Sequence, residues 1–213
     1  MMPQMSLEAM PAAAGEGVDL HWQAVGQGTP VLLIHGTAAA LWGELPQRLA
    51  GFARAISYDR RGFGRSAGRP ATTLPVHADD AAALLRAQGG GAAVLVGWSI
   101  GGVIALEVAA RYPQLVRGLV LLEPPLHAKK HPSLGLLNGV VGSILSGALL
   151  GAARGGRRFS RWVFREEGGG NSLDRLAQAD RAALDANAAS VCLELRGGTG
   201  EHLSAGRLRA IDC

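Results

Sequence analysis

Short apolar runs alternate with helical patterns over the first 125 residues of the chain. Residues 31–34 and 93–96 are wholly apolar, which is typical of central strands that are buried on both faces. The spacing of apolar positions also predicts helices at 41–50, 76–88 and 100–112 and strands at 55–58 and 119–122. Strands that alternate with helices predict an α/β fold, with a mostly parallel sheet and helices on both of its faces.

One strand precedes this series. Residues 19–25 alternate polar and apolar side chains, which indicates a strand with one buried face. The glycines and proline of residues 26–30 then predict a turn. We therefore expect residues 19–25 and 31–34 to pair as an antiparallel hairpin.

The pattern changes after Pro125, where helical segments and glycine loops replace the buried strands. The uncharged run 133–153 has the length of a membrane span, but five glycines and Asn138 interrupt it. This composition favours apolar cap helices over a pocket, and we expect no membrane partner. The predicted division is an α/β core over residues 17–125, a helical cap region over 126–208 and the start of a further core segment at 209–213.

The charge of the chain does not indicate a nucleic-acid partner. The formal net charge is +4, but the basic residues are mostly scattered and no aromatic residues are interleaved with them to stack bases. The two cysteines, Cys192 and Cys213, suit a reducing compartment, and residues 1–17 lack the features of a signal peptide. We therefore expect a cytoplasmic protein.

The strongest chemical motif lies between the strand at 93–96 and the helix at 100–112. Residues 97–101 read Gly-Trp-Ser-Ile-Gly, with the serine on a turn from a strand into a helix. Such a turn forces a serine into a strained conformation and exposes its hydroxyl, while the glycines let the chain pass close to itself. This context predicts Ser99 as a catalytic nucleophile.

A second motif, His35-Gly36-Thr37, follows the strand at 31–34. An oxyanion hole needs two backbone N–H donors that point at one position. We expect the backbone N–H of Ile100, the residue after the nucleophile, to be one donor and that of Thr37 to be the other. We expect a structural role based on hydrogen bonding for His35.

Together these motifs resemble the α/β-hydrolase fold family, in its branch of bacterial esterases and cofactor-free haloperoxidase-like enzymes. The resemblance covers residues 17–125 and rests on motifs at 34–37, 58–66, 77–80, 97–102 and 119–125. It implies that the loop Asp59-Arg60-Arg61-Gly62 is structural. It also implies a triad in the chain order serine, acid, histidine.

The resemblance places the usual acid and the catalytic histidine beyond residue 213, so we expect a fragment or a shortened gene product. Some relatives carry the acid at the position of Glu123, which makes this residue an alternative orienting carboxylate. The histidines after Ser99 have no motif around them; they are His127, His131 and His202.

These features predict a serine hydrolase that acts on a small hydrophobic carboxylic ester or a related acyl bond through a covalent acyl-enzyme. The histidines and acids lack metal-ligand spacing, so no metal and no cofactor are expected. The alternative is a non-catalytic binding protein that keeps a hydrolase-like pocket. Esterase, perhydrolase, C–C hydrolase and acyltransferase activities stay open, as does the oligomeric state.

Overall fold

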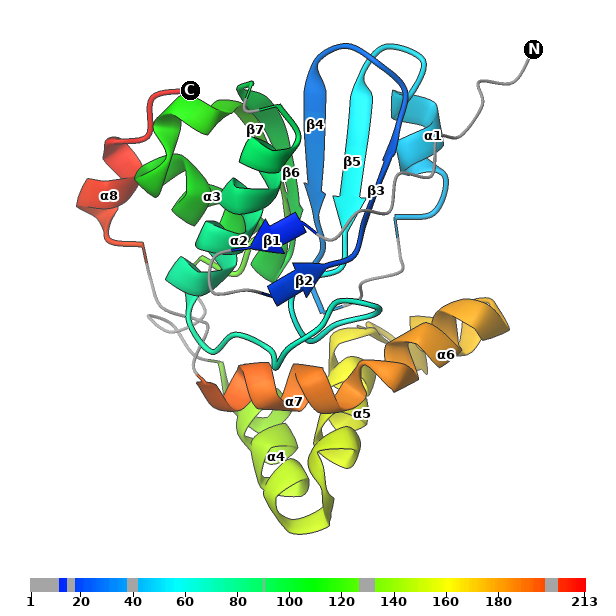
Figure 1. Cartoon of the computed structure of the whole chain (residues 1–213). Coiled ribbons are helices and arrows are strands. Elements are labelled where there is room, and N and C mark those ends of the chain that lie inside the picture. Colours follow the sequence, from blue (N-terminus) through cyan, green and yellow to red (C-terminus); the bar gives the residue numbers. More distant parts are fainter. Residues whose placement is uncertain (1–11, 15–17, 38–41, 90, 127–132, 198–202) are drawn as a thin grey trace.

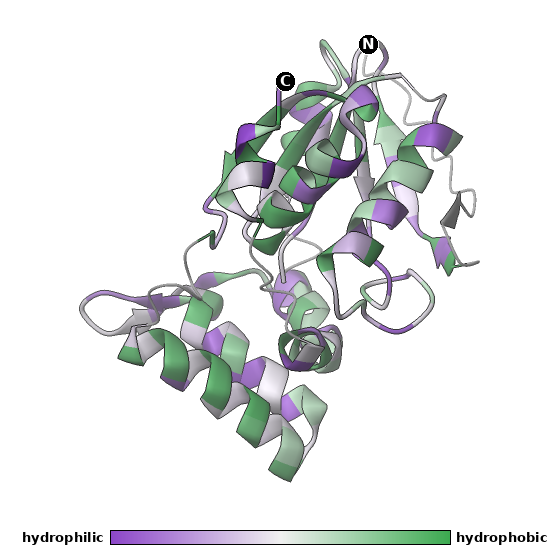
Figure 2. Cartoon of the chain, turned by 90° about the vertical axis from the view of Figure 1, so that its left-hand side faces the viewer, coloured by the Kyte–Doolittle hydropathy of each residue, from purple (hydrophilic) through white to green (hydrophobic). Residues whose placement is uncertain are grey.

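The computed structural model describes residues 12–14, 18–37, 42–89, 91–126, 133–197 and 203–213. Figure 1 shows a sheet with flanking helices in the upper part of the molecule and a second group of helices beneath it. The hydrophobic residues lie inside the upper part, and they also run along the lower helices (Figure 2).

The upper part is built on one five-stranded sheet. Its strands are β3 (Trp22–Val25), β4 (Pro30–Ile34), β5 (Arg54–Tyr58), β6 (Ala93–Trp98) and β7 (Val116–Leu122). They lie in the order β3-β5-β4-β6-β7, and every neighbouring pair except β3 and β5 is parallel. The predicted mostly parallel sheet is therefore confirmed. In the described residues β7 forms one edge of it.

The predicted hairpin between residues 19–25 and 31–34 is wrong. β3 pairs with β5, with Trp22 opposite Tyr58, and β5 separates β3 from β4. The turn after β3 crosses the beginning of β5, where the Arg54 N–H donates to the Thr29 carbonyl at 3.0 Å. This crossing requires Gly26, because its φ is +80° and a Cβ there would overlap the Ala53 carbonyl oxygen. β4, buried on both faces, takes the centre of the sheet, while the half-buried β3 takes the edge.

The first part of the predicted strand 19–25 belongs to a second, smaller sheet. There β2 (Val18–Leu20) pairs with β1 (Ala12–Ala14) in an antiparallel arrangement.

The two faces of the large sheet carry separate cores. Leu32 and Ile34 of β4 pack with α2 (Leu74–Ala87) and α3 (Ile100–Arg111) in the larger core. Val31 and Leu33 point to the opposite face, where residues of α1 (Leu45–Leu49) pack against them. The alternation of side chains along one strand thus explains why helices cover both faces.

The lower part, which we call the cap, spans residues 134–197. It contains α4 (Leu134–Leu150), α5 (Ala152–Val163), the short strands β8 (Arg165–Glu166) and β9 (Gly170–Asn171), the 3-10 helix η2 (Ser172–Arg175), α6 (Gln178–Ala186) and α7 (Ala188–Gly197). α4 and α5 form a helical hairpin that projects away from the sheet (Figure 1), and both pack on α7.

Glycines make this close packing of the cap helices possible. A Cβ at Gly155 would lie 2.5 Å from the Ser143 carbonyl oxygen and 2.8 Å from the Cα of Gly147. Within the apolar run 133–153, a Cβ at Gly139 would overlap the Trp162 ring of α5, and a Cβ at Gly147 would overlap the Cys192 sulfur of α7, so these two glycines serve contacts between helices. Among the residues that the structure describes, no helix is both long enough and apolar enough to cross a bilayer.

After the cap, the chain returns to the upper part. α8 (Ala205–Arg209) packs against α3, where Arg207 donates to the buried carboxylate of Glu107 at 2.9 Å. The 3-10 helix η1 (Pro113–Leu115) connects α3 to β7.

Candidate active site

The chain turns sharply between β6 and α3, and Ser99 occupies this turn. Its φ is +54° and its ψ is −125°, a conformation that a residue with a side chain rarely adopts. Such strain costs about 1–3 kcal/mol and persists only where the surroundings enforce it. One restraint is direct, because the Ser99 N–H donates to the Leu122 carbonyl at 2.8 Å.

Three glycines supply the remaining room around the turn. A Cβ at Gly97 would overlap the Gly101 carbonyl oxygen, and a Cβ at Gly101 would overlap the Ile34 carbonyl oxygen. A Cβ at Gly36 would lie 3.0 Å from the Cβ of Ser99. The end of β4, the end of β6 and the beginning of α3 thus approach each other too closely for side chains, which leaves the serine at the tip of the turn.

The structure brings the three predicted site residues to one cavity of about 730 Å³. Ser99, Thr37 and Ile100 all line it. Ile100 is the first residue of α3, so its N–H is one of those that a helix leaves without an intrahelical partner. The positive end of the helix dipole lies at the same place and favours developing negative charge.

The cap forms the opposite wall of this cavity, and most of that wall is apolar. Its apolar residues come from α4, α5 and α7; they are Leu136, Val140, Phe159, Trp162, Val163 and Leu195. Arg165, Glu166, Glu167 and Glu194 add charged groups to the lining. The arrangement suits an apolar ligand whose polar group reaches Ser99.

Glu123 lies just after β7 and shares a smaller cavity of about 230 Å³ with Ser99 and Thr37. It is exposed and has a φ of +49°. The three histidines after Ser99 lie outside the described residues. The histidines within the described ranges do not line either cavity at Ser99, and those ranges contain no group of potential metal ligands.

His35 is fully buried behind the predicted oxyanion loop. Its Nε2 accepts from the Arg60 backbone N–H at 2.9 Å, so its Nδ1 carries the proton and donates to the Gly36 carbonyl at 2.7 Å. Burial, and then the Arg60 guanidinium, lower the pKa of His35 to about 3. Its hydrogen bonds agree with the structural role expected from the sequence.

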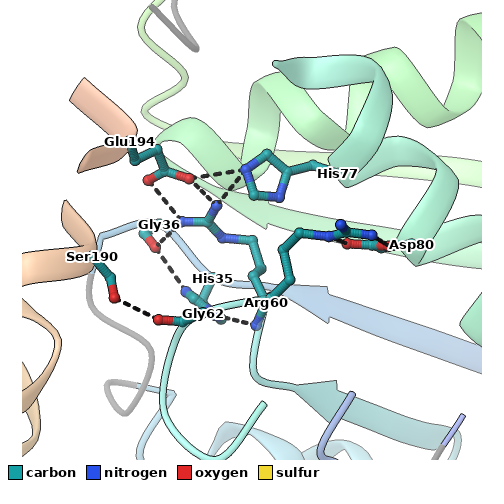
Figure 3. A network of polar contacts seen from close by, with 9 residues as sticks. His35, Gly36, Arg60, Gly62, His77, Asp80, Ser190 and Glu194 are labelled. Carbon is teal, nitrogen blue, oxygen red and sulfur yellow. Dashed lines mark hydrogen bonds and ion pairs between the residues drawn. The ribbon is translucent and has the colours of Figure 1, made fainter. Parts of the chain in front are cut away.

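A buried polar cluster joins this loop to the cap (Figure 3). The Arg60 guanidinium forms an ion pair with Glu194 of α7 and also donates through Nη2 to the Gly36 carbonyl at 2.9 Å. His77 Nε2 lies 2.9 Å from the Glu194 carboxylate. Burial alone would raise the pKa of Glu194, but Arg60 outweighs it and holds this pKa at about 2.

The neighbouring Arg61 forms a separate ion pair between its own loop and Asp80 of α2. Its Nε and Nη2 donate to both oxygens of the Asp80 carboxylate, at 2.6 and 2.5 Å. Both charged residues of the Arg60-Arg61 pair are therefore buried and paired, as a structural loop requires.

Sequence reasoning missed the role of Glu194. A signal was present, because this carboxylate stands in the apolar stretch Ala188–Leu195 of a helix and needs a cation when buried. The identity of that cation could not be read from the sequence, since Arg60 lies 134 positions earlier.

A comparison with protein-family models identifies the fold. The model described as alpha/beta hydrolase fold matches residues 29–190, which is more than half of the chain. The chain belongs to the α/β-hydrolase fold family. The fold class and the family resemblance predicted from the sequence are thereby confirmed.

Individual relatives of this α/β-hydrolase are esterases and lipases by name. The pimeloyl-[acyl-carrier protein] methyl ester esterase of Vibrio campbellii is 33% identical over 126 residues, which are 58% of this chain and 48% of that protein. The lipase LipV of Mycobacterium tuberculosis is 40% identical over 111 residues, which are 50% of this chain and 42% of the lipase. The aligned region thus spans about half the length of these curated relatives.

Solved structures match a larger share of this chain. A thermophilic esterase from Thermogutta terrifontis superposes with a TM-score of 0.73 at 25% identity, covering 96% of this chain and 76% of the esterase. An alpha/beta hydrolase from Sphaerobacter thermophilus superposes with a TM-score of 0.69 at 26% identity. This match covers 93% of this chain and 77% of that protein.

The packing at the turn predicts a large effect of Gly101→Ala. The added Cβ would overlap the Ile34 carbonyl, so we expect the free energy of unfolding to fall by about 3 kcal/mol. Gly118→Ala is the matched control, because a Cβ at Gly118 meets nothing within 4 Å. Urea unfolding of both variants measures the difference, and equal stabilities would contradict the proposed crowding at the turn.

The buried neutral His35 predicts acid sensitivity. Its pKa is about 3 in the folded chain and about 6.5 when unfolded, so the unfolded state binds more protons below pH 6.5. The free energy of unfolding should therefore decline as pH falls from about 6.5 towards 3. His35→Asn, which cannot titrate, should decline less steeply in urea unfolding from pH 8 to 4. An imidazole NMR signal of folded His35 that titrates near pH 6.5 would contradict this assignment.

Proposed function

We propose that this chain carries the nucleophile and the oxyanion hole of a serine hydrolase that cleaves carboxylic esters or related acyl bonds. The observation that carries the proposal is the strained backbone of Ser99, at the wall of a largely apolar cavity that Thr37 and Ile100 also line. Strain of this kind costs free energy, and a strand-to-helix turn that carries it exposes a serine hydroxyl to a bound substrate.

In the proposed mechanism, the Ser99 hydroxyl oxygen attacks the ester carbonyl carbon and loses its proton to a general base. The carbonyl electron pair moves to the oxygen, and the N–H groups of Thr37 and Ile100 stabilise the resulting negative charge. Collapse of this intermediate expels the alcohol and leaves an acyl group on Ser99. Water then attacks the acyl carbon and releases the acid.

The family's chain order of serine, acid and histidine implies a histidine as the general base, and the histidines of the described ranges do not line the cavities at Ser99. His35 cannot take the role because both of its ring nitrogens already form hydrogen bonds. Glu123 shares the smaller cavity with Ser99, which makes it an alternative orienting carboxylate for that histidine.

The substrate class follows from the cavity and from the relatives. Apolar side chains of α4 and α5 would accept a small hydrophobic acyl or alcohol group. The names of the relatives, a methyl ester esterase and a lipase, support ester chemistry.

The free thiols of Cys192 and Cys213 suit a reducing compartment such as the cytoplasm.

A second candidate function is binding without catalysis. It is favoured by one observation, that the histidines in the described ranges do not line the cavities at Ser99. Such a protein would bind hydrophobic esters in the cavity and release them unchanged.

The proposal predicts that p-nitrophenyl butyrate acylates Ser99 and releases p-nitrophenol. Ser99→Ala should abolish this release, because the acyl group then has no acceptor. Ser172→Ala is the control, since Ser172 lines the smaller cavity beside Ser99 but donates its hydroxyl to Glu166 at 2.7 Å. It should release p-nitrophenol as the unmodified chain does.

Release that persists in Ser99→Ala would overturn the assignment of the nucleophile. A chain that binds the ester and releases no p-nitrophenol would instead support the binding function.

A further inference from the structure

The peptide bond between Gly36 and Thr37 is held from its carbonyl side. Two donors converge on the Gly36 carbonyl oxygen, His35 Nδ1 at 2.7 Å and Arg60 Nη2 at 2.9 Å. A trans peptide is planar, so its C=O and the next residue's N–H point in opposite directions. Fixing the carbonyl on the buried side therefore fixes the direction of the Thr37 N–H on the other side of the same peptide.

We propose that Arg60 and Glu194 are positioning residues for the oxyanion hole, through which the cap helix α7 sets the direction of the Thr37 N–H. The inference rests on the proposed function, in which that N–H stabilises the oxyanion. Glu194 forms an ion pair with Arg60, and Arg60 donates to the Gly36 carbonyl (Figure 3). The direction of that carbonyl fixes the direction of the Thr37 N–H.

The chemistry of arginine explains why one side chain can make both contacts. The planar guanidinium carries two Nη groups, so it donates to Glu194 with both and to Gly36 with Nη2. Phe63 supports the plane of this group, because the Arg60 Cζ lies 4.5 Å from the centre of the Phe63 ring. Arg60 is only 1% exposed and Glu194 only 3%, so little of either side chain is open to competing water.

A purely structural ion pair between α7 and the core is the competing interpretation. Other contacts already attach this end of the cap, since Ser190 donates to the Gly62 carbonyl at 2.5 Å and Gly64 donates to Asn187 at 2.8 Å. Arg60 differs from these contacts because it also reaches the Gly36 carbonyl. A structural role predicts altered stability alone, whereas a positioning role predicts an altered Thr37 amide and a lower kcat.

The test uses the double variant Arg60→Met/Glu194→Gln in the full chain. It removes both buried charges together, and the new amide can still bond to His77. The matched control is Arg61→Met/Asp80→Asn, which removes the neighbouring buried ion pair between the same loop and α2. Proton–nitrogen NMR measures the shift and solvent exchange of the Thr37 amide, and p-nitrophenyl butyrate gives kcat and KM.

We expect the Thr37 signal to shift and its exchange to rise about 10-fold in Arg60→Met/Glu194→Gln, because the peptide can rotate. The kcat should fall about 100-fold, as for the loss of one oxyanion donor, with KM changed less than about 2-fold. The control should keep the Thr37 signal and kcat of the unmodified chain. An unchanged Thr37 amide, or equal changes in the control, would overturn the proposal.

Two features keep the test decisive. If the double variant does not fold, Arg60→Lys retains the charge but offers one nitrogen where the guanidinium offers two, so the Thr37 amide should still change. A folded Arg60→Lys variant with an unchanged amide and kcat would count against the proposal. The NMR measurement needs no turnover, so the Thr37 amide decides this inference even in an inactive chain, and the assay of p-nitrophenol release tests the proposed function separately.

Discussion

The close approach of three backbone segments around Ser99 is the constraint on which the rest of the site depends. The end of β4, the end of β6 and the beginning of α3 meet where Gly36, Gly97 and Gly101 leave no room for side chains. This crowding enforces a serine φ of +54°, whose cost of about 1–3 kcal/mol the packing of the sheet must offset. The sheet and its two helical layers thus act as a rigid support for one strained residue.

A second constraint connects this support to the cap. The cluster of Arg60, Glu194 and His77 buries a positive and a negative charge between α7 and the loop that follows β4. Buried ion pairs contribute little net stability, because the loss of hydration offsets their attraction. The geometry of the guanidinium is a better reason for this pair, since it connects a helix of the cap to the Gly36 carbonyl beside Ser99.

The features that the sequence predicted correctly are local ones. The apolar runs of β4 and β6 and the Gly-Trp-Ser-Ile-Gly turn depend on residues close together in the chain, and the structure places all of them as expected. The pairing of β3 was predicted wrongly because strand order depends on contacts between distant segments. The ion pair of Glu194 was not predicted for the same reason, because its partner Arg60 lies in a distant part of the chain. Neither the sequence nor the described residues identify the catalytic base.

The most direct test of the account is an experimental structure of the chain after reaction with a p-nitrophenyl phosphonate. This reagent transfers a tetrahedral phosphonyl group to a nucleophilic serine and leaves an oxygen where the oxyanion of an ester would lie. The account predicts one adduct, on Ser99, with its phosphoryl oxygen about 2.7–3.1 Å from the backbone nitrogens of both Thr37 and Ile100. An adduct on another residue, or a phosphoryl oxygen directed away from these two amides, would contradict it.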